Sequence, residues 1–478
     1  MCNKPVLITF NKQLISLIIL FNLLYPAAFS QEKISKTLLA EDLDVLKQNL
    51  ETYHTGLYTY TSKKEFDNWF ADTKRTLKDS SPLSFFNKVN ELNLLIKNGH
   101  TFFHINPEQR GKDLLMPSFN IYKDGEQFYI KSLKDGSDKS IIGKKIIAVN
   151  HESFPAVFNR LLKYEERDGN NLTQPTEELQ YTFARKYALA FGNKTTTTVT
   201  VESNQVVKNI VLKNIPMEAF SQKTDDQYEN GQIEFSVENG IGRLVMPTFN
   251  EIALEKQRYK QRLKSIFDKI EKEKVQHLII DIRNNGGGDT ESVEELISYL
   301  YNDEFTFYTD VYQLHKKWDH SIIPDIHSYP KNTSNWALKK GEDGFFRGII
   351  RSDGMKKVKP KKQIYAGKLY VLINGSSLSA AAEFASFIRQ YRPATFIGDE
   401  AGGNKVQNTS GYSLTIGLPH SKIIVSIPVL LWKMNVSFEN NGYGIKPDHF
   451  VRNTIAEEMA SEDSILRFAY QLIDQEEQ

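Results

Sequence analysis

An alternation of apolar strands with longer amphipathic stretches, which begins after Ile233, restricts the fold of this chain more than any other feature. The strand-like runs are "GRLVMPTF", "HLIIDIR" and "KLYVLIN", and a stretch of helical periodicity follows each of them. Strands buried on both faces read as continuous apolar runs, and helices between such strands favour a parallel sheet. We therefore predict an α/β domain over residues 231–478, with ligands bound at the carboxyl ends of its strands.

Two regions of different periodicity precede this domain. Apolar residues three and four apart predict a helical region over residues 31–108. Hairpins such as "FNIYKDGEQFYI" and "TTTTVTVESNQVVKNIVL" predict a β-rich domain over residues 109–215, and the polar, turn-rich residues 216–230 are expected to be a linker. The last helix before the β-rich domain should end at "NGH", which leaves His100 in a loop.

The N-terminus has the pattern of an export signal over residues 1–30. Lysines precede the apolar run "LISLIILFNLLY", and "PAAFSQ" with its small residues follows that run. The run is shorter than the about 20 residues that span a bilayer, so we expect cleavage and no remaining membrane span, with an uncleaved anchor as the alternative. The mature protein should be periplasmic or extracellular. Cys2 is the single cysteine and precedes the run, which excludes thiol catalysis and Cys-ligated metals in the mature chain.

The overall charge does not favour a polyanionic partner. Lys and Arg number 60 against 59 Asp and Glu, which gives a formal net charge of +1. A balance of this kind creates no field that would attract nucleic acid or an anionic membrane.

Two unusual loops should lie at the carboxyl ends of predicted strands. In "NNGGGD" consecutive glycines allow backbone N–H groups to approach a ligand, since no Cβ intervenes. The stretch matches neither common phosphate-binding glycine pattern, and a tight turn before a helix is the structural alternative. In "GSSLS" three hydroxyls precede the helix "AAAEFASFIRQY", and any of them would serve as an ordinary N-cap.

Ser379 has the best position for a nucleophile among the three serines. It stands directly before the helix, whose N-terminal amides favour negative charge on the serine or on a substrate oxyanion held by the Ala380 N–H. A capping box would need Glu or Gln three residues later, where Ala382 stands. The sequence also lacks the G-x-S-x-G elbow of α/β-hydrolases.

The ordered motifs "RLVMPTF", "LIIDIRNNGGG", "VLINGSSLSAAAEFA", "FIGDEAGG" and "GYGIKPD" resemble those of one serine peptidase family. This family includes the C-terminal processing (tail-specific) peptidases and the catalytic core of tricorn protease. The resemblance implies a crotonase/ClpP-like catalytic domain and peptide-bond hydrolysis. It also implies Ser379 as the nucleophile, with the amides of Ala380 and of Gly287 or Gly288 as oxyanion donors. The piece "IIGKKIIAVNHESF" is similar to an element of PDZ domains, which makes the β-rich domain PDZ-like.

The general base differs between branches of this family. Tail-specific members place a Lys where this chain has Asn404, with Lys405 one residue later, and a one-residue slip turns an extended side chain to the opposite face. The tricorn-like branch uses an early His and a Glu near the C-terminal Pro-Asp motif, which His100 in "IKNGHTFF" and Glu439 in "SFENNGYGIKPD" resemble. Asp399 and Glu400 are rivals for the acid.

The sequence therefore predicts an exported serine endopeptidase of the tricorn-like Ser-His branch, which needs no metal or organic cofactor. The substrate would be a polypeptide, bound through its C-terminus at the PDZ-like domain. One alternative is a Ser-Lys dyad with Lys405. Another is a catalytically inactive peptide-binding protein of the same fold. A crotonase-type enzyme acting on acyl thioesters would share the oxyanion hole but not the export signal or the PDZ-like domain.

Overall fold

The structure is a computed structural model that describes residues 33–111, 114–134, 136, 139–217, 231–315, 338–348 and 354–478. The predicted export signal and residues 218–230 of the predicted linker lie outside the described residues. Among the described helices none is both long and apolar enough to cross a membrane.

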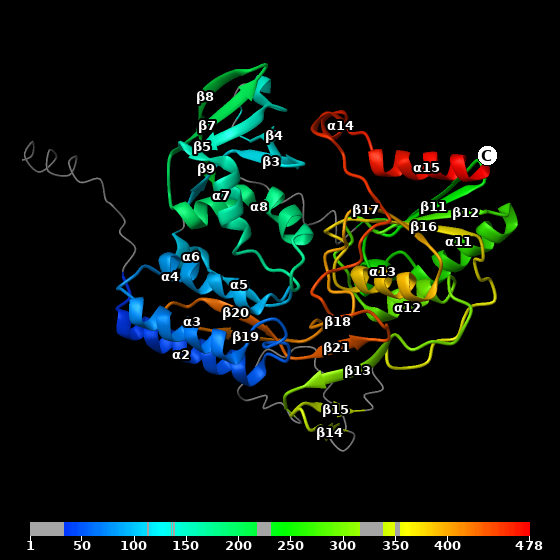
Figure 1. Cartoon of the computed structure of the whole chain (residues 1–478), viewed down its shortest axis with the longest axis horizontal. Coiled ribbons are helices and arrows are strands. Elements are labelled where there is room, and N and C mark those ends of the chain that lie inside the picture. The colour runs from blue at the N-terminus through cyan, green and yellow to red at the C-terminus, as the bar shows by residue number, and fades with distance from the viewer. Residues whose placement is uncertain are drawn as a thin grey trace, which may run out of the picture.

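A six-stranded sheet forms the centre of the C-terminal half (Figure 1), and the mixed α/β content agrees with the sequence. Its strand order is β10-β11-β12-β16-β17-β22, with β10 antiparallel and all other pairs parallel. The bounds are Glu234–Glu238 (β10), Ile241–Val245 (β11), His277–Asp281 (β12), Lys368–Ile373 (β16), Thr395–Gly398 (β17) and His449–Phe450 (β22). All of β12 is buried, as its continuous apolar run predicts.

Helices cover both faces of this sheet. One face packs against Tyr259–Glu273 (α11), Thr290–Ile297 (α12) and Ala380–Tyr391 (α13), and the other packs against Ser464–Glu477 (α15). The sequence suggested one helix before β12, whereas the structure has Glu251–Glu255 (α10) and α11, separated by Arg258 with φ 53°. The short helix Ile455–Ala460 (α14) precedes α15. The layered arrangement leaves the carboxyl ends of β12 and β16 open for a site.

The N-terminal helices do not form a core of their own. They are Lys36–Tyr53 (α2), Lys63–Thr76 (α3), Pro82–Val89 (α4), Asn93–Ile96 (α5) and, after a short strand, Pro107–Arg110 (α6). The predicted stripe of α2 is buried, and it shares its core with a sheet made of Phe102–His104 (β1), Ile424–Pro428 (β20) and Ser413–Gly417 (β19). Figure 1 shows these early helices beside strands from near the other end of the chain. Residues 33–108 and part of the C-terminal half are thus one packing unit.

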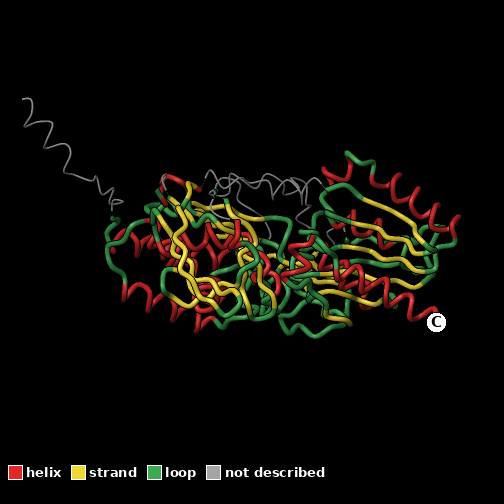
Figure 2. Tube along the Cα trace, turned by 90° about the horizontal axis from the view of Figure 1, so that it is seen from above, coloured by secondary structure: helices red, strands yellow, loops and turns green. Residues whose placement is uncertain are grey.

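The β-rich domain contains two helices that its strand pattern did not indicate. Its main sheet has the order β3-β4-β5-β7-β8 with β6 paired to β5, over Phe119–Asp124, Gln127–Leu133, Lys145–Val149, Thr196–Ser203, Val206–Lys213 and Glu152–Ser153. Leu115–Met116 (β2) pairs with Ile215–Pro216 (β9). Phe154–Leu162 (α7) and Thr173–Phe191 (α8) cover one face of the sheet through buried aromatic residues. Seen from above, this domain and the large sheet lie side by side along the long axis (Figure 2).

A further sheet lies below the large one in Figure 1 and has the order β14-β15-β13-β21-β18. Its strands are Leu338–Lys340, Phe346–Gly348, Tyr308–Gln313, Leu431–Met434 and Gln407–Asn408. The last of these strands carries Asn408 toward the carboxyl end of β16.

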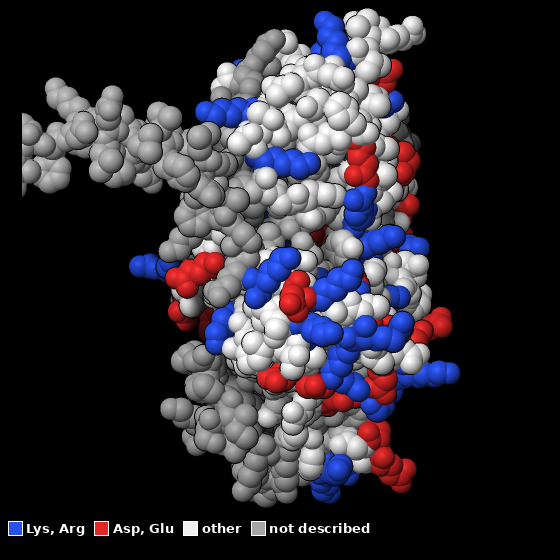
Figure 3. Space-filling model, turned by 90° about the vertical axis from the view of Figure 1, so that its left-hand side faces the viewer, with Lys and Arg blue, Asp and Glu red and all other residues white. Residues whose placement is uncertain are grey.

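The surface charges seen in Figure 3 are mixed. Lys and Arg side chains lie there with Asp and Glu among them. On α2 and α3 such charges form surface ion pairs, for example Lys63 with Glu51 at 2.7 Å. Pairs of this kind contribute little to stability, but they divide the surface charge into small areas of both signs.

Candidate active site

Ser379 stands at the junction of strand and helix in an unusual backbone conformation. It is the residue before α13, with φ 52° and ψ −124°, and its side chain makes no capping hydrogen bond. A non-glycine residue at positive φ is uncommon and persists only where its surroundings hold it, which is frequent at functional sites. The hydroxyl oxygen accepts a hydrogen bond from Asn408 Nδ2 at 3.3 Å. The Ser379 hydroxyl is therefore available as a donor or a nucleophile.

The other two serines of the turn are engaged in structural hydrogen bonds. Ser376 donates its N–H and its hydroxyl to Glu177 Oε2, at 2.8 and 2.9 Å. Ser377 is fully buried and donates its hydroxyl to the Ile282 carbonyl at 2.8 Å. Both residues shape the turn, and Ser379 alone of the three donates no such hydrogen bond.

The glycine turn after β12 lies directly against the serine turn. A Cβ on Gly287, whose φ is 103°, would lie 2.7 Å from Ser379 Cβ and 2.9 Å from the Ala380 nitrogen. A Cβ on Gly288 would lie 2.1 Å from the Phe249 carbonyl carbon. Only glycine allows both approaches. The tight-turn and oxyanion interpretations of "NNGGGD" are thus compatible, since the turn brings its amides beside Ser379.

The amides of this region differ in their hydrogen bonding. The Gly287 N–H donates to Asn285 Oδ1 at 2.9 Å. The N–H groups of Gly288 and Ala380 have no hydrogen-bond partner among the described residues. Unpaired amides at a helix start next to a hydroxyl are the groups that an oxyanion requires.

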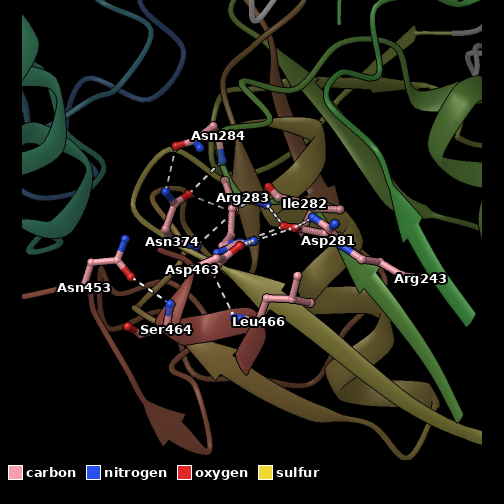
Figure 4. A network of polar contacts seen from close by, with 11 residues as sticks. Arg243, Asp281, Ile282, Arg283, Asn284, Asn374, Asn453, Asp463, Ser464 and Leu466 are labelled. Atoms are coloured by element: carbon pink, nitrogen blue, oxygen red, sulfur yellow. Dashed lines mark hydrogen bonds and ion pairs between the residues drawn. The ribbon is translucent and has the colours of Figure 1, made fainter. Parts of the chain in front are cut away.

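Polar contacts at the base of the site tie the two turns together (Figure 4). The Asn284 N–H donates to Asn374 Oδ1 at 2.9 Å, and Asn374 Nδ2 donates back to Asn284 Oδ1 at 2.8 Å. Arg283 forms ion pairs with Asp281 and Asp463, the latter at the start of α15. The ends of β12 and β16 therefore have a fixed separation.

His100 lies in the loop after α5, which is held by a row of hydrogen bonds. The His54 ring accepts from the Gly56 N–H at Nδ1, so its Nε2 donates to Thr101 Oγ1 at 2.8 Å. Thr101 donates to Asn98 Oδ1, which also accepts from the His100 N–H, and Asn98 Nδ2 donates to Thr409 Oγ1 at 2.7 Å. Thr409 follows Asn408, the partner of Ser379. The row therefore links the histidine loop to Thr409, whose chain neighbour Asn408 contacts the nucleophile.

The helix before this loop ends one residue earlier than the predicted Asn-Gly cap. Lys97, with φ 48°, is the left-handed C-cap of α5. Asn98 and Gly99 are instead the residues that fix the loop.

The acid next to the histidine loop is Asp168, a residue that the sequence did not suggest. Its Oδ1 accepts the Gly99 N–H at 2.8 Å, and the residue is buried. Burial lowers the pKa of His100, and the charge of Asp168 acts in the opposite direction. Nδ1 of His100 is buried without a partner among the described residues. Nothing local marks Asp168, because it lies 69 positions from Gly99 along the chain.

Comparison with known proteins identifies the family of the C-terminal domain. Residues 240–451 match the model of peptidase family S41. The domain belongs to this family of serine-type peptidases. The structure of mature CPAF complexed with lactacystin is 14% identical over 92% of this chain and 99% of that chain, with a TM-score of 0.62. The structure of mature CPAF is also 14% identical, over 89% of this chain and 94% of that chain, with a TM-score of 0.60. At this identity the likeness shows a shared fold.

The structure of tricorn protease is 12% identical over 92% of this chain and 37% of that chain, with a TM-score of 0.38. A likeness at this level does not distinguish the branches of family S41, so the predicted Ser-His branch stays a prediction.

Neither of the two remaining candidate residues, Glu439 and Lys405, has a hydrogen bond or ion pair with Ser379 or His100 among the described residues. Glu439 lies in an exposed loop, and the structure shows no side-chain hydrogen bond or ion pair from it to another described residue. Lys405 lies near Glu400, on whose pKa its charge acts, and makes no described contact with Ser379. Asn404, in the position where tail-specific members have Lys, donates to Asn440 Oδ1 at 2.9 Å and to Tyr60.

A buried acid of α13 stands behind the nucleophile in the S41 domain. Glu383 accepts from the Tyr308 hydroxyl at 2.9 Å, and burial raises the pKa of its carboxyl to about 7. Asn408 contacts both this carboxyl and Ser379. Oε1 of Glu383 and Oδ1 of Asn408 have no hydrogen-bond partner among the described residues, so a proton on Glu383 would satisfy both oxygens. Charged residues of helices usually face solvent, but Glu383 is only 2% exposed.

Proposed function

We propose that this protein is an exported serine endopeptidase in which Ser379 attacks the scissile peptide carbonyl. The observation that carries the proposal is the Ser379 backbone, held at positive φ against Gly287, with a hydroxyl that takes no part in capping the helix. The membership of residues 240–451 in family S41 supports the reaction class. The likeness to mature CPAF supports the overall arrangement of the chain.

His100 is the proposed general base. Its lowered pKa keeps the imidazole neutral at physiological pH, so that it can take the Ser379 proton. The proton leaves Oγ as Oγ bonds to the carbonyl carbon, and it then passes to the leaving amine. The oxyanion is held by the Ala380 N–H together with an amide of Gly287 or Gly288, and water resolves the acyl-enzyme.

Glu439 stays a predicted orienting acid, and Lys405 stays an alternative base. The exposure of Glu439 gives it no buried contact with the histidine loop. For Lys405 to serve, its ammonium would have to reach the Ser379 hydroxyl, with which it has no contact among the described residues.

The substrate is a polypeptide in this proposal, and the β-rich domain acts as a PDZ-like module beside a crotonase/ClpP-like catalytic domain. In the β-rich domain, β3 is an edge strand and α8 packs along it. An edge strand beside a helix is the arrangement that captures an extended C-terminus in PDZ domains. Gln180 of α8 accepts the Lys123 N–H at 2.6 Å. A peptide that adds to β3 would therefore displace a side chain of the protein.

A catalytically inactive peptide-binding protein is the second candidate. It is favoured by Asn404, which leaves this chain without the lysine of the tail-specific peptidases. It would bind peptides at the same edge strand, β3, and retain affinity without turnover.

Labelling by a fluorophosphonate tests the proposal, because such reagents react with activated serine hydroxyls. The wild-type protein without residues 1–30 and the variants Ser379→Ala and His100→Ala are compared. Ser84→Ala, which alters an exposed serine of α4, is the matched control. We expect wild type and Ser84→Ala to label and the other two to fall to background. Equal labelling of Ser379→Ala would disprove the nucleophile, and peptide binding without any labelling would favour the second candidate.

A further inference from the structure

A short stretch before and within the first turn of α8, residues 168–177, contacts both halves of the site. At one end Asp168 Oδ1 accepts the Gly99 N–H at 2.8 Å, directly before His100. At the other end Glu177 accepts both the N–H and the hydroxyl of Ser376, in the turn that leads to Ser379. The stretch therefore spans from the histidine loop to the nucleophile turn.

Contacts with two further loops keep this stretch rigid. Asn171 is fully buried, and its Nδ2 donates to the Ala401 carbonyl at 2.6 Å. The Asn170 N–H donates to the Gly442 carbonyl at 2.7 Å. A Cβ on Gly169, whose φ is 62°, would lie 2.5 Å from Gly442 Cα. Backbone packed this closely cannot shift without moving the neighbouring loop.

Asp168 is a buried carboxylate without a cationic partner. It is 8% exposed and forms no ion pair with a Lys or Arg of the described residues. A buried charge is costly unless it is paired, and hydrogen bonds to backbone N–H groups offset only part of that cost. A positive charge that forms nearby during the reaction would complete the pairing.

We propose that Asp168 is the positioning acid of the site, which holds the histidine loop through Gly99 and stabilises the imidazolium of His100 after it takes the Ser379 proton. This proposal rests on the peptidase function proposed above and deepens it. The other titratable groups near Asp168 are Tyr60 and Glu383, on both of which its charge acts, with His54 and Lys97 at the ends of the loop. Of these groups Asp168 alone places a carboxylate on the backbone next to His100.

The charge of Asp168 should affect how labelling of Ser379 depends on pH. A carboxylate that favours the imidazolium raises the pKa of His100, so removal of its charge must lower that pKa further. Without the charge of Asp168, the labelling rate of the free enzyme should therefore stay constant down to a lower pH than in the wild type. A purely structural change would alter the rate without moving this inflection.

The experiment measures the second-order rate constant of fluorophosphonate labelling from pH 4 to 9. The variants are Asp168→Asn, Asp168→Glu, Glu177→Ala and the control Asp72→Asn, an exposed acid of α3. For Asp168→Asn we expect the rate constant of labelling to fall by about 100-fold. This is a typical effect of a misplaced reacting group, and it is smaller than the ~10⁴-fold loss of rate when the aspartate of a catalytic triad is replaced. The acid-side inflection of Asp168→Asn should move to lower pH. Glu177→Ala should lower the rate without moving the inflection, and Asp168→Glu should keep the wild-type inflection.

Each result decides for or against Asp168. An Asp168→Asn profile that matches Asp72→Asn overturns the proposal, as does a shifted inflection in Glu439→Gln together with an unshifted one in Asp168→Asn. Thermal unfolding checks that each variant folds. If Asp168→Asn does not fold, Asp168→Ser is measured in its place and judged by the same criteria. Absence of Ser379-dependent labelling in wild type would instead reject the peptidase function itself, which separates the two failures.

Discussion

The nucleophile turn and the histidine loop are held in place by different forces. The turn of residues 374–379 rests on close backbone packing, with Gly287 touching Ser379 and a Cβ on Gly375 only 2.6 Å from the carbonyl carbon of Thr173. The loop of residues 97–101 rests on a row of side-chain hydrogen bonds that starts at His54. The nucleophile turn is therefore sensitive to substitutions that add volume. The histidine loop is sensitive to substitutions that remove a polar group or change its charge.

This difference has a physical reason. The serine turn continues two neighbouring strands of a buried parallel sheet, so its position follows from strands that already pair in register. The histidine loop comes from a helical region whose next strand, β1, pairs with β20 and not with a strand of the large sheet. Without a shared ladder of backbone hydrogen bonds, side chains must provide the specific contacts.

Gly287→Ala should give the largest effect, because its new Cβ would lie within 2.9 Å of three atoms of the serine turn. We expect fluorophosphonate labelling to fall by about 100-fold or more, since small displacements of reacting groups are costly. Gly125→Ala is the matched control, because it also has positive φ but no atom within 4 Å of the new Cβ. Similar labelling of the two variants would show that close packing does not position Ser379.

Asn98→Ala should have the next largest effect, through lost polar contacts and without added volume. Asn98 is 7% exposed, and its removal leaves the His100 N–H and the Thr409 hydroxyl without their partner. We expect a loss of about 1–3 kcal/mol in the free energy of unfolding. Labelling should fall by about tenfold from the misplaced histidine. The control is Asn209→Ala, an exposed residue of β8 bonded only to Thr200. Unchanged labelling in Asn98→Ala would show that the row does not position His100.

His54 should make the histidine side of the molecule less stable in acid. Burial lowers the pKa of His54 to about 3 from 6.5. Below pH 6.5 His54 is protonated in the unfolded chain but stays neutral in the folded chain. The free energy of unfolding therefore falls as the pH drops from 6.5 toward 3, by at most about 1.4 kcal/mol per pH unit. His54→Gln should flatten this slope in urea unfolding measured at several pH values. An unchanged slope would argue against a neutral His54.

Glu383 should produce the opposite, and smaller, slope on the nucleophile side. Burial raises the pKa of its carboxyl to about 7 from 4.5, so the folded chain keeps a proton that the unfolded chain releases. Stability contributed by this group is complete below pH 4.5 and declines toward pH 7. Glu383→Gln mimics the protonated acid. In this variant the free energy of unfolding should rise more steeply with pH between 4.5 and 7 than in the wild type. A slope equal to that of wild type would contradict a protonated Glu383.

Much of the fold was predictable because burial repeats at short intervals. The stripe of α2, the hairpins β3–β4 and β7–β8 and the buried strand β12 all follow local periodicity. The missed helices α7 and α8 lie among the hairpins, and α8 begins after Leu172 without a side-chain cap. With no start signal, its apolar positions did not distinguish it from the surrounding strands.

For the site, the sequence by itself determined the chemistry available at one strand end. A serine directly before a helix, beside a run of glycines, is a local pattern, and it separates Ser379 from Ser376 and Ser377 before any coordinates are known. Only the tertiary structure decided what faces His100 and what stands behind Ser379. Asp168 and Glu383 obtain their surroundings from loops and strands far along the chain. Such contacts have no period in the sequence, because they depend on how separate elements pack and not on which face of one element is buried.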